Sequence, residues 1–245
     1  PNRGQTVISV VIPAYNEASR ITPTIEELIE YLADASIDAE IIVVDDGSTD
    51  DTVGVATRAL SGFPSGKVIP TSPNRGKGHA VRVGMLAASR PLRLFMDADG
   101  STSLDSLEPC LEAVQADPAG RTIAIASVAV KGAVITHPQP FPRGLAGRVA
   151  NLVIQALVLP GIKDTQRGFK LFTAQAAEAA FADATVNGWL FDVETLALAK
   201  RRGYTIIEIP VVWEHREDSR VTGSYFATLG ELLAIRWRLW FGGIS

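Results

Sequence analysis

Short apolar segments alternate with amphipathic ones along the first half of the chain. Residues 6–12, 39–44 and 92–96 are almost wholly apolar, and an apolar run of this length is typical of a strand buried on both faces. Between the first two, in residues 21–32, apolar side chains recur every three or four positions, which predicts a helix. Consecutive strand–helix–strand segments form right-handed βαβ units. The pattern therefore predicts an α/β fold with a mostly parallel central sheet and helices on both faces.

The rest of the chain continues this alternation without an internal repeat or a low-complexity linker, so we expect one domain over residues 1–222. Pro210 interrupts the last apolar segment, which is typical of an edge strand or a bulge. The segment 131–147 carries several prolines and is predicted to be a loop, and a loop of that length is usually functional or mobile. Further strands are expected at 67–70, 121–130 and 204–213, and the segment 164–172 leads into another. Further helices are expected at 52–60, 79–89, 104–116, 149–159 and 174–181, and the segment 188–194 leads into a helix that ends at 202–203.

Residues 223–245 are predicted to form an amphipathic helix. Apolar side chains recur every three or four residues there, beside two arginines. Tryptophans with arginines favour a membrane interface, and the alternative is a helix packed on its own domain or on a partner subunit. The residues leave both interpretations open. The apolar positions are Phe226, Leu229, Leu233, Trp237 and Trp240, and the arginines are Arg236 and Arg238.

Composition excludes several classes of protein. With 245 residues, 47% of them hydrophobic and 20% charged, the chain is globular rather than disordered. A net charge of −4 argues against nucleic-acid binding. The single Cys110 excludes an internal disulfide or a cysteine zinc cluster and suits a reducing cytoplasm. The apolar stretch 149–162 is too short to cross a bilayer, and no signal peptide precedes the first strand. We therefore expect a cytoplasmic protein, peripheral at the cytoplasmic face of a membrane.

Two carboxylates follow the strand predicted at 92–96. Asp97 and Asp99 are two residues apart, so in an extended segment both project from the same face. They lie at the carboxyl end of a buried strand, where open α/β sheets bind their ligands. Mg²⁺ is usually held by one or two carboxylates together with substrate phosphates. We therefore predict a divalent metal that bridges the chain to a diphosphate, and the alternative is a pair of acids that only opens a turn.

A basic loop before the helix at 79–89 is a second candidate site. Arg75 and Lys77 lie among glycines at the N-terminus of that helix, where free N–H groups and the helix dipole favour anions. A solvated basic turn is the alternative. The spacing is not that of a Walker loop, and no Gly-x-Gly-x-x-Gly turn follows a strand, which argues against a kinase or a dehydrogenase.

Six segments along residues 6–220 carry a recognisable pattern. In order, they are VISVVIPAYNEASRI, IIVVDDGSTDDT, NRGKGHAVRVGM, LFMDADGST, DTQRGFKLF and GWLFDVETLALAKRRGYTIIEIPVVW. In these segments the chain resembles family-2 glycosyltransferases of the GT-A fold, and within that family it is most similar to dolichyl-phosphate β-glucosyltransferases and their prokaryotic polyprenyl-phosphate relatives. VDDGSTD and DAD indicate the broad family, whereas NRGKG, DTQRGFKLF and FDVE indicate the lipid-phosphate branch.

The resemblance implies a single GT-A (Rossmann-like) domain that moves a hexose, with inversion, from a nucleotide sugar to a polyprenyl or dolichyl phosphate. It also implies Mg²⁺ or Mn²⁺ as cofactor and roles for the matching residues. On the donor side, the residues of the base and ribose pocket would be Pro13, Ala14, Tyr15, Glu17, Asp45 and Asp46, and the residues near the diphosphate or the sugar would be Arg75 and Lys77. The metal would be held by Asp97, Asp99 and Ser101.

On the acceptor side, the resemblance implies that Asp192 and Glu194 face the sugar and the acceptor. The cations for the lipid phosphate would be Arg143, Arg148, Arg167 and Lys170, with Lys131.

The chain departs from the family pattern on the acceptor side. Related mannosyltransferases carry Gly-Ser-Arg where this chain has residues 126–128, Ala-Ser-Val, so that arginine is absent. The glucosyltransferases usually carry a Cys at the position of Arg167. These departures leave the donor site intact. At the position of Ser101, related mannosyltransferases carry a Gln that binds the metal.

Several alternatives stay open at this point. UDP-glucose is the favoured donor, and GDP-mannose is the alternative. A phosphate acceptor is already ionised near neutral pH, whereas a soluble hydroxyl acceptor would require Asp192 or Glu194 as a general base. A nucleotide-sugar-binding module without catalysis is a rival of another class.

Overall fold

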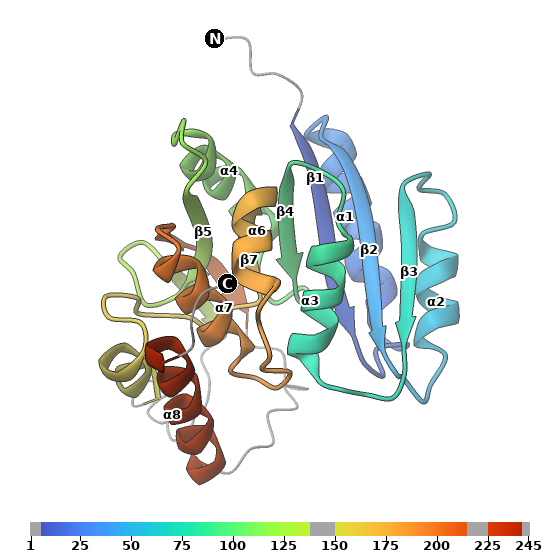
Figure 1. Cartoon of the computed structure of the whole chain (residues 1–245). Helices are drawn as coiled ribbons and strands as arrows, with labels where there is room; N and C mark the ends of the chain where they lie inside the picture. Colours follow the sequence, from blue (N-terminus) through green and yellow to red (C-terminus); the bar gives the residue numbers. More distant parts are fainter. Residues whose placement is uncertain (1–5, 138–149, 215–224, 242–245) are drawn as a thin grey trace.

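The computed structural model describes residues 6–137, 150–214 and 225–241, and a seven-stranded sheet forms its centre (Figure 1). The strands are β1 (Val7–Ala14), β2 (Asp38–Asp46), β3 (Gly66–Thr71), β4 (Leu92–Met96), β5 (Thr122–Ser127), β7 (Phe169–Thr173) and β8 (Thr205–Pro210). Their order across the sheet is β3-β2-β1-β4-β7-β5-β8. Only β7 runs antiparallel to its neighbours, β4 and β5. The predicted α/β fold with a mostly parallel sheet is confirmed.

Helices cover both faces of this sheet (Figure 1). One face carries α1 (Ile21–Asp34), α2 (Thr52–Ala59), the 3₁₀ turn η1 (Leu104–Ser106) and α4 (Leu107–Gln115). The other face carries α3 (Lys77–Ala87), α6 (Ala174–Phe181) and α7 (Phe191–Arg201), and residues 150–157 are also helical. Each face has its own hydrophobic core, as expected when every central strand is apolar on both sides.

The alternation of side chains along the strands decides which residues face which core. In β4, Leu94 and Met96 pack with α1 and α4, whereas Phe95 packs on the opposite face with α3 and α7. Phe95 lies opposite Lys170 of the antiparallel strand β7, and the Lys170 ammonium lies 4.9 Å from its ring centroid. Asp97 has the same parity as Phe95, so the pleat directs it to the face of α3 and α7. Alternation thus gathers the charged residues on one face.

A second, smaller sheet pairs β6 (Val134–His137) with β9 (Val212–Glu214) in parallel. The prediction of a loop throughout 131–147 is wrong over residues 134–137, because the partner of that strand lies far along the chain and local patterning does not reveal it. Pro210 ends β8 at the edge of the main sheet, as predicted, and the chain then enters β9. Trp213 of β9 bridges to Thr102, so this small sheet supports the segment that follows Asp99.

The C-terminal helix α8 (Tyr225–Phe241) is present as predicted. Leu232 and Ile235 are buried in the core that also contains Ile154 and residues of α7. One face of the helix therefore packs on the rest of the chain. In the part of the chain that the structure describes, no helix has the length and apolarity needed to span a bilayer.

Candidate active site

The predicted metal-binding residues lie directly beyond β4, close to the start of β7. The N–H of Asp97 donates a hydrogen bond to the carbonyl of Gly168, with 2.9 Å between N and O. A Cβ at position 168 would lie 2.0 Å from Cγ of Asp97, so only glycine allows the two segments to come this close. The two motifs that contain these residues, far apart in the sequence, meet at this point.

Lys77 is the first residue of α3 and pairs with Asp97. Its Nζ lies 2.5 Å from Oδ1 of Asp97 and 5.1 Å from the centroid of the Trp189 ring. Burial by itself lowers the pKa of Lys77, but the carboxylates of Asp97, Asp192 and Asp99 outweigh it and raise that pKa overall. The lysine is therefore held protonated, in contact with the carboxylate that was predicted to bind the metal.

A second ion pair lies near the first and is almost completely buried. Nζ of Lys170 lies 2.6 Å from Oδ1 of Asp192 and donates to the carbonyl of Arg167 at 2.5 Å. The two side chains are 1% and 2% exposed. Burial lowers the pKa of Lys170 and raises that of Asp192, and the mutual attraction opposes both shifts. The lysine thereby fixes Asp192 in position, and removal of either partner would leave an uncompensated buried charge.

The two pairs balance each other electrically. Lys77 and Lys170 offset Asp97 and Asp192, and Asp99 adds one further negative charge beside them. Asp99 accepts a hydrogen bond from the N–H of Ser101 at 2.9 Å, an arrangement that directs the loop around the carboxylates.

The donor set suits a hard divalent cation. Asp97, Asp99 and Ser101 offer carboxylate and hydroxyl oxygens, which Mg²⁺ and Mn²⁺ prefer. Among the described residues, however, no group of three or more His, Cys, Asp or Glu side chains could hold a metal on its own. The fit is therefore to an ion that takes its remaining ligands from a substrate, as Mg²⁺ does with phosphates.

The predicted nucleotide pocket lies at the ends of β1 and β2. The N–H of Asn16 donates to Oγ of Ser48 at 2.8 Å, and Oδ1 of Asn16 accepts from the N–H of Thr49 at 2.8 Å. These bonds clamp residues 13–17 against the loop after β2. Sequence reasoning missed this role of Asn16, although its positive φ of 56° is a position where Asn is favoured.

Several residues of this predicted pocket are engaged with the protein itself. Asp45 accepts hydrogen bonds from the N–H groups of Gly47 and Ser48 at 3.2 and 3.1 Å, and Glu17 forms an ion pair with Arg20. Tyr15 is 38% exposed at the rim. Pro13 and Ala14 close β1 beside them. The structure brings the predicted residues together, and their contact with a base and ribose stays a prediction.

The carboxylate of Asp46 holds the basic loop in place. Its carboxylate accepts the N–H of Arg75 at 3.1 Å and that of Gly76 at 2.6 Å, and lies 3.4 Å from Nδ1 of His79. Asp46 is buried, whereas the side chain of Arg75 is exposed. The N–H of Gly78 donates to the carbonyl of Asn187 at 2.7 Å. This framework presses the start of α3 against the segment before α7 and so places Lys77 near Asp192.

The structure does not bring Glu194 into the charged cluster. Glu194 accepts hydrogen bonds from the N–H groups of Thr185 and Val186 at 2.9 and 2.6 Å and pairs with Arg238 of α8 at 2.8 Å. Residues two apart on a helix are about 200° apart around its axis, so Glu194 and Asp192 point in different directions. The contact of Glu194 with the sugar or acceptor, which the family resemblance implies, stays a prediction.

The basic residues predicted to bind the acceptor phosphate differ in their surroundings. Arg167 pairs with Asp164, 3.0 Å from Nε to Oδ2, and its guanidinium lies 4.4 Å from the ring centroid of Trp213. Lys131 is exposed, and Arg143 and Arg148 lie outside the described residues. Sequence reasoning missed Asp164, which is buried and also accepts the N–H of Val128 at 3.1 Å.

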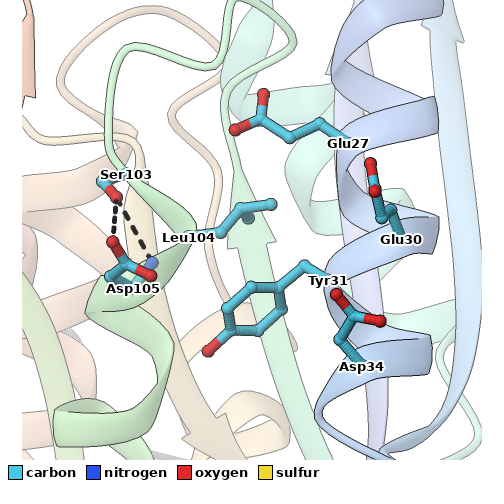
Figure 2. Close-up of a pocket in the computed structure, with 7 residues that line it drawn as sticks. All are labelled: Glu27, Glu30, Tyr31, Asp34, Ser103, Leu104 and Asp105. Carbon is cyan, nitrogen blue, oxygen red and sulfur yellow. Dashed lines mark hydrogen bonds between the residues drawn. The ribbon is translucent and has the colours of Figure 1, made fainter.

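A hollow between α1 and residues 103–105 is a different kind of surface, which Figure 2 shows with acidic side chains around it. Its volume of about 210 Å³ is below the 300–1,000 Å³ typical of small-molecule sites, and its carboxylates would repel a diphosphate. We therefore do not place the donor there. The lining residues are Glu27, Glu30, Tyr31, Asp34, Ser103, Leu104 and Asp105.

A sequence model of the family described as Glycosyl transferase family 2 matches residues 9–181. The chain belongs to this family. A dolichyl-phosphate beta-glucosyltransferase from Homo sapiens is 37% identical to this glycosyltransferase over 243 residues, which cover 94% of this chain and 75% of that protein. One from Trichomonas vaginalis is 36% identical over 219 residues, covering 86% of this chain and 65% of that protein. The chain thus spans about two thirds to three quarters of the lengths of these relatives.

Solved structures show the same fold. Glucosyl-3-phosphoglycerate synthase from Mycobacterium tuberculosis, in complex with Mn²⁺, uridine-diphosphate and phosphoglyceric acid, aligns with a TM-score of 0.66 at 21% identity, covering 99% of this glycosyltransferase and 81% of that chain. Mannosyl-3-phosphoglycerate synthase from Rubrobacter xylanophilus aligns with a TM-score of 0.65 at 17% identity, covering 96% and 72%. The predicted GT-A fold is confirmed.

Proposed function

We propose that this glycosyltransferase moves glucose from UDP-glucose to a dolichyl or polyprenyl phosphate, with inversion at the anomeric carbon. The names of the relatives that cover most of the chain support this choice of donor sugar and acceptor. The observation that carries the proposal is the charged cluster at the carboxyl end of β4. There Lys77 meets Asp97 and Lys170 meets Asp192, within a fold whose relative binds UDP together with Mn²⁺.

The donor diphosphate would bind between the carboxylates after β4 and the N-terminus of α3. Asp97, Asp99 and Ser101 would hold Mg²⁺ or Mn²⁺, which when bound acts as a Lewis acid toward the departing diphosphate. Lys77 adds a cation at the same place, at the N-terminus of α3, where the helix dipole favours an anion. Asp192, fixed by Lys170, would orient hydroxyl groups of the sugar.

In the transfer, an oxygen of the acceptor phosphate bonds to the anomeric carbon as the bond from that carbon to the UDP oxygen breaks. The phosphate is already ionised near neutral pH, so no side chain has to remove a proton. The chain has to bring two anions together instead. Arg167 and Lys77 would supply positive charge at this step, together with Arg143 and Arg148.

The exposed face of α8 would contact the membrane that contains the lipid acceptor. Leu229, Leu233, Trp237 and Trp240 are between 43% and 68% exposed, and their spacing places them on one side of the helix. The buried residues of α8 lie on its other side. An apolar face with tryptophan at its end is typical of a helix that lies in the membrane interface.

The test is a transfer assay with purified protein and Mn²⁺. Radioactive UDP-glucose and GDP-mannose are each offered with polyprenyl phosphates of several lengths, with 3-phosphoglycerate, or with a simple sugar. We expect label in the lipid fraction from UDP-glucose only. Label only in water-soluble products would contradict the lipid acceptor, and donor binding without turnover or hydrolysis would favour a binding module.

A further inference from the structure

The ammonium of Lys77 occupies the position next to Asp97 that a metal ion bound to this carboxylate would need. Its ammonium lies 2.5 Å from Oδ1, and the side chains of Lys77 and Asp97 are only 18% and 30% exposed, so water screens the pair weakly. The backbone of α3 is held in place by the bond between Gly78 and Asn187. The four-carbon stem of the lysine, in contrast, can rotate.

An ammonium and a divalent ion bound to this one oxygen repel each other. A Mg²⁺ ion binds carboxylate oxygens at about 2.0–2.1 Å, so a metal on Oδ1 of Asp97 would lie close to Nζ of Lys77, which is 2.5 Å from the same oxygen. The repulsion falls if Asp97 rotates or if the lysine leaves. A Cβ at position 168 would lie 2.0 Å from Cγ of Asp97, which shows how closely the β7 segment covers that carboxylate. The lysine is therefore the partner that can move.

We propose that the ammonium of Lys77 takes the place of the metal before the donor binds, and that it moves to the diphosphate when the metal and donor arrive. The inference rests on the proposed function, because the diphosphate is that of the proposed donor. Without a donor, the metal has to displace a cation and finds no third acidic ligand among the described residues. With a donor, the diphosphate supplies both oxygen ligands for the metal and a new partner for Lys77.

This exchange makes the binding of metal and donor cooperative. Metal alone binds weakly because it has to displace the ammonium from Asp97, and donor alone meets the negative charge that Asp99 adds to the two balanced pairs. Coupling between two ligands is typically 5–150-fold. Removal of the lysine charge would therefore tighten metal binding in the absence of nucleotide and reduce the gain that nucleotide provides.

The experiment measures Mn²⁺ affinity from the electron paramagnetic resonance signal of free Mn²⁺, with and without UDP. Lys77→Met removes the charge, and Lys77→Arg retains it as the matched control. Without UDP, we expect Lys77→Met to bind Mn²⁺ about tenfold more tightly than the wild type, and Lys77→Arg to remain weak. Equal affinity in Lys77→Met and the wild type would overturn the exchange, provided that UDP-glucose still promotes Mn²⁺ binding to the wild type.

A wild type that binds no Mn²⁺ even with UDP-glucose would instead overturn the proposed donor site and with it the exchange. A crystal structure of the wild type with Mn²⁺ and UDP gives a second measurement that needs no variant to fold. There we expect Nζ of Lys77 on the diphosphate oxygens. A lysine that still contacts Oδ1 of Asp97 beside the bound metal would refute the proposal.

Discussion

Asp97 joins three parts of the site within hydrogen-bond distance: the lysine of α3, the carbonyl of Gly168 before β7, and the loop that leads to Asp99. Loss of one electrostatic contact to a developing charge typically lowers a rate by about 10²–10³. We therefore expect Asp97→Asn and Asp99→Asn each to lower kcat by about that factor, while circular dichroism melting shows a folded protein. Wild-type rates in either variant would remove the metal role from that carboxylate.

Glu40, at the other end of the strands, gives a stability effect that should be separable from activity. Burial by itself raises the pKa of Glu40, but hydrogen bonds from Ser9 and Ser89 and the charge of Lys67 lower it to about 2. An unfolded Glu has a pKa of about 4.3. The carboxylate therefore stabilises the fold fully above that pH and loses its contribution as the pH falls toward 2.

For Glu40→Gln we expect the free energy of unfolding at pH 7 to fall by about 1–2 kcal/mol, because the amide accepts weaker hydrogen bonds than the carboxylate. The difference from the wild type should shrink below about pH 4.3. Urea unfolding at several pH values measures this difference in the free energy of unfolding, and kcat of Glu40→Gln at pH 7 should equal that of the wild type. A difference that stays constant down to pH 2.5 would show that the charge of Glu40 does not contribute.

At the scale of elements, α7 serves two sides of the molecule with residues two positions apart. Asp192 faces the cluster, while Glu194 binds the segment before the helix and Arg238 of α8. We expect Glu194→Gln to lower the free energy of unfolding by about 1–3 kcal/mol, because the substitution weakens the hydrogen bonds that the buried carboxylate accepts from two N–H groups. Chemical denaturation and transfer kinetics measure the two effects.

Glu178→Gln on the exposed face of α6 is the matched control and should change neither quantity. A general base contributes typically 10²–10⁴-fold to a rate. If kcat of Glu194→Gln falls by such a factor while its stability is unchanged, Glu194 acts on the substrate in a conformation other than the one described.

Most elements were predictable because their signal is local. The runs at 6–12, 39–44 and 92–96 mark β1, β2 and β4 by apolar content alone, and the carboxylates after β4 follow from strand parity. Two features were not predictable: the antiparallel direction of β7 and the pairing of β6 with β9. Both depend on contacts between residues far apart in the sequence.

The site shows the same division between local and distant information. Asp97 and Asp99 were identified from their position after a strand. The ion pair of Lys77 with Asp97 was not, because it requires α3 to begin at Lys77, two residues before the predicted start. The contacts of Glu194 with Thr185, Val186 and Arg238 were not predicted either, because they depend on how α7 packs on the segment before it and on α8.

At the scale of the whole molecule, the strand ends and the C-terminal helix share one end. The arrows of β1, β2 and β4 point toward the lower part of Figure 1, and α8 lies there as well. Asp97 and Asp99, which we propose bind the metal, follow β4 at that end. An acceptor with its phosphate at the site and its chain in a membrane would therefore find α8 at the same end of the molecule as the proposed chemistry.

This arrangement predicts that membrane binding depends on the tryptophans of α8. Trp237 and Trp240 are 66% and 68% exposed, so Trp237→Ser with Trp240→Ser removes apolar surface at little cost to the fold. We expect the protein to float with phosphatidylcholine–phosphatidylserine liposomes and the double variant to float much less, because each buried apolar Å² contributes about 25 cal/mol. Leu86→Ser, an exposed apolar residue of α3, is the control and should float like the parent. Equal flotation of parent and double variant, or none in the parent, would contradict the membrane contact and favour a helix that only packs on protein.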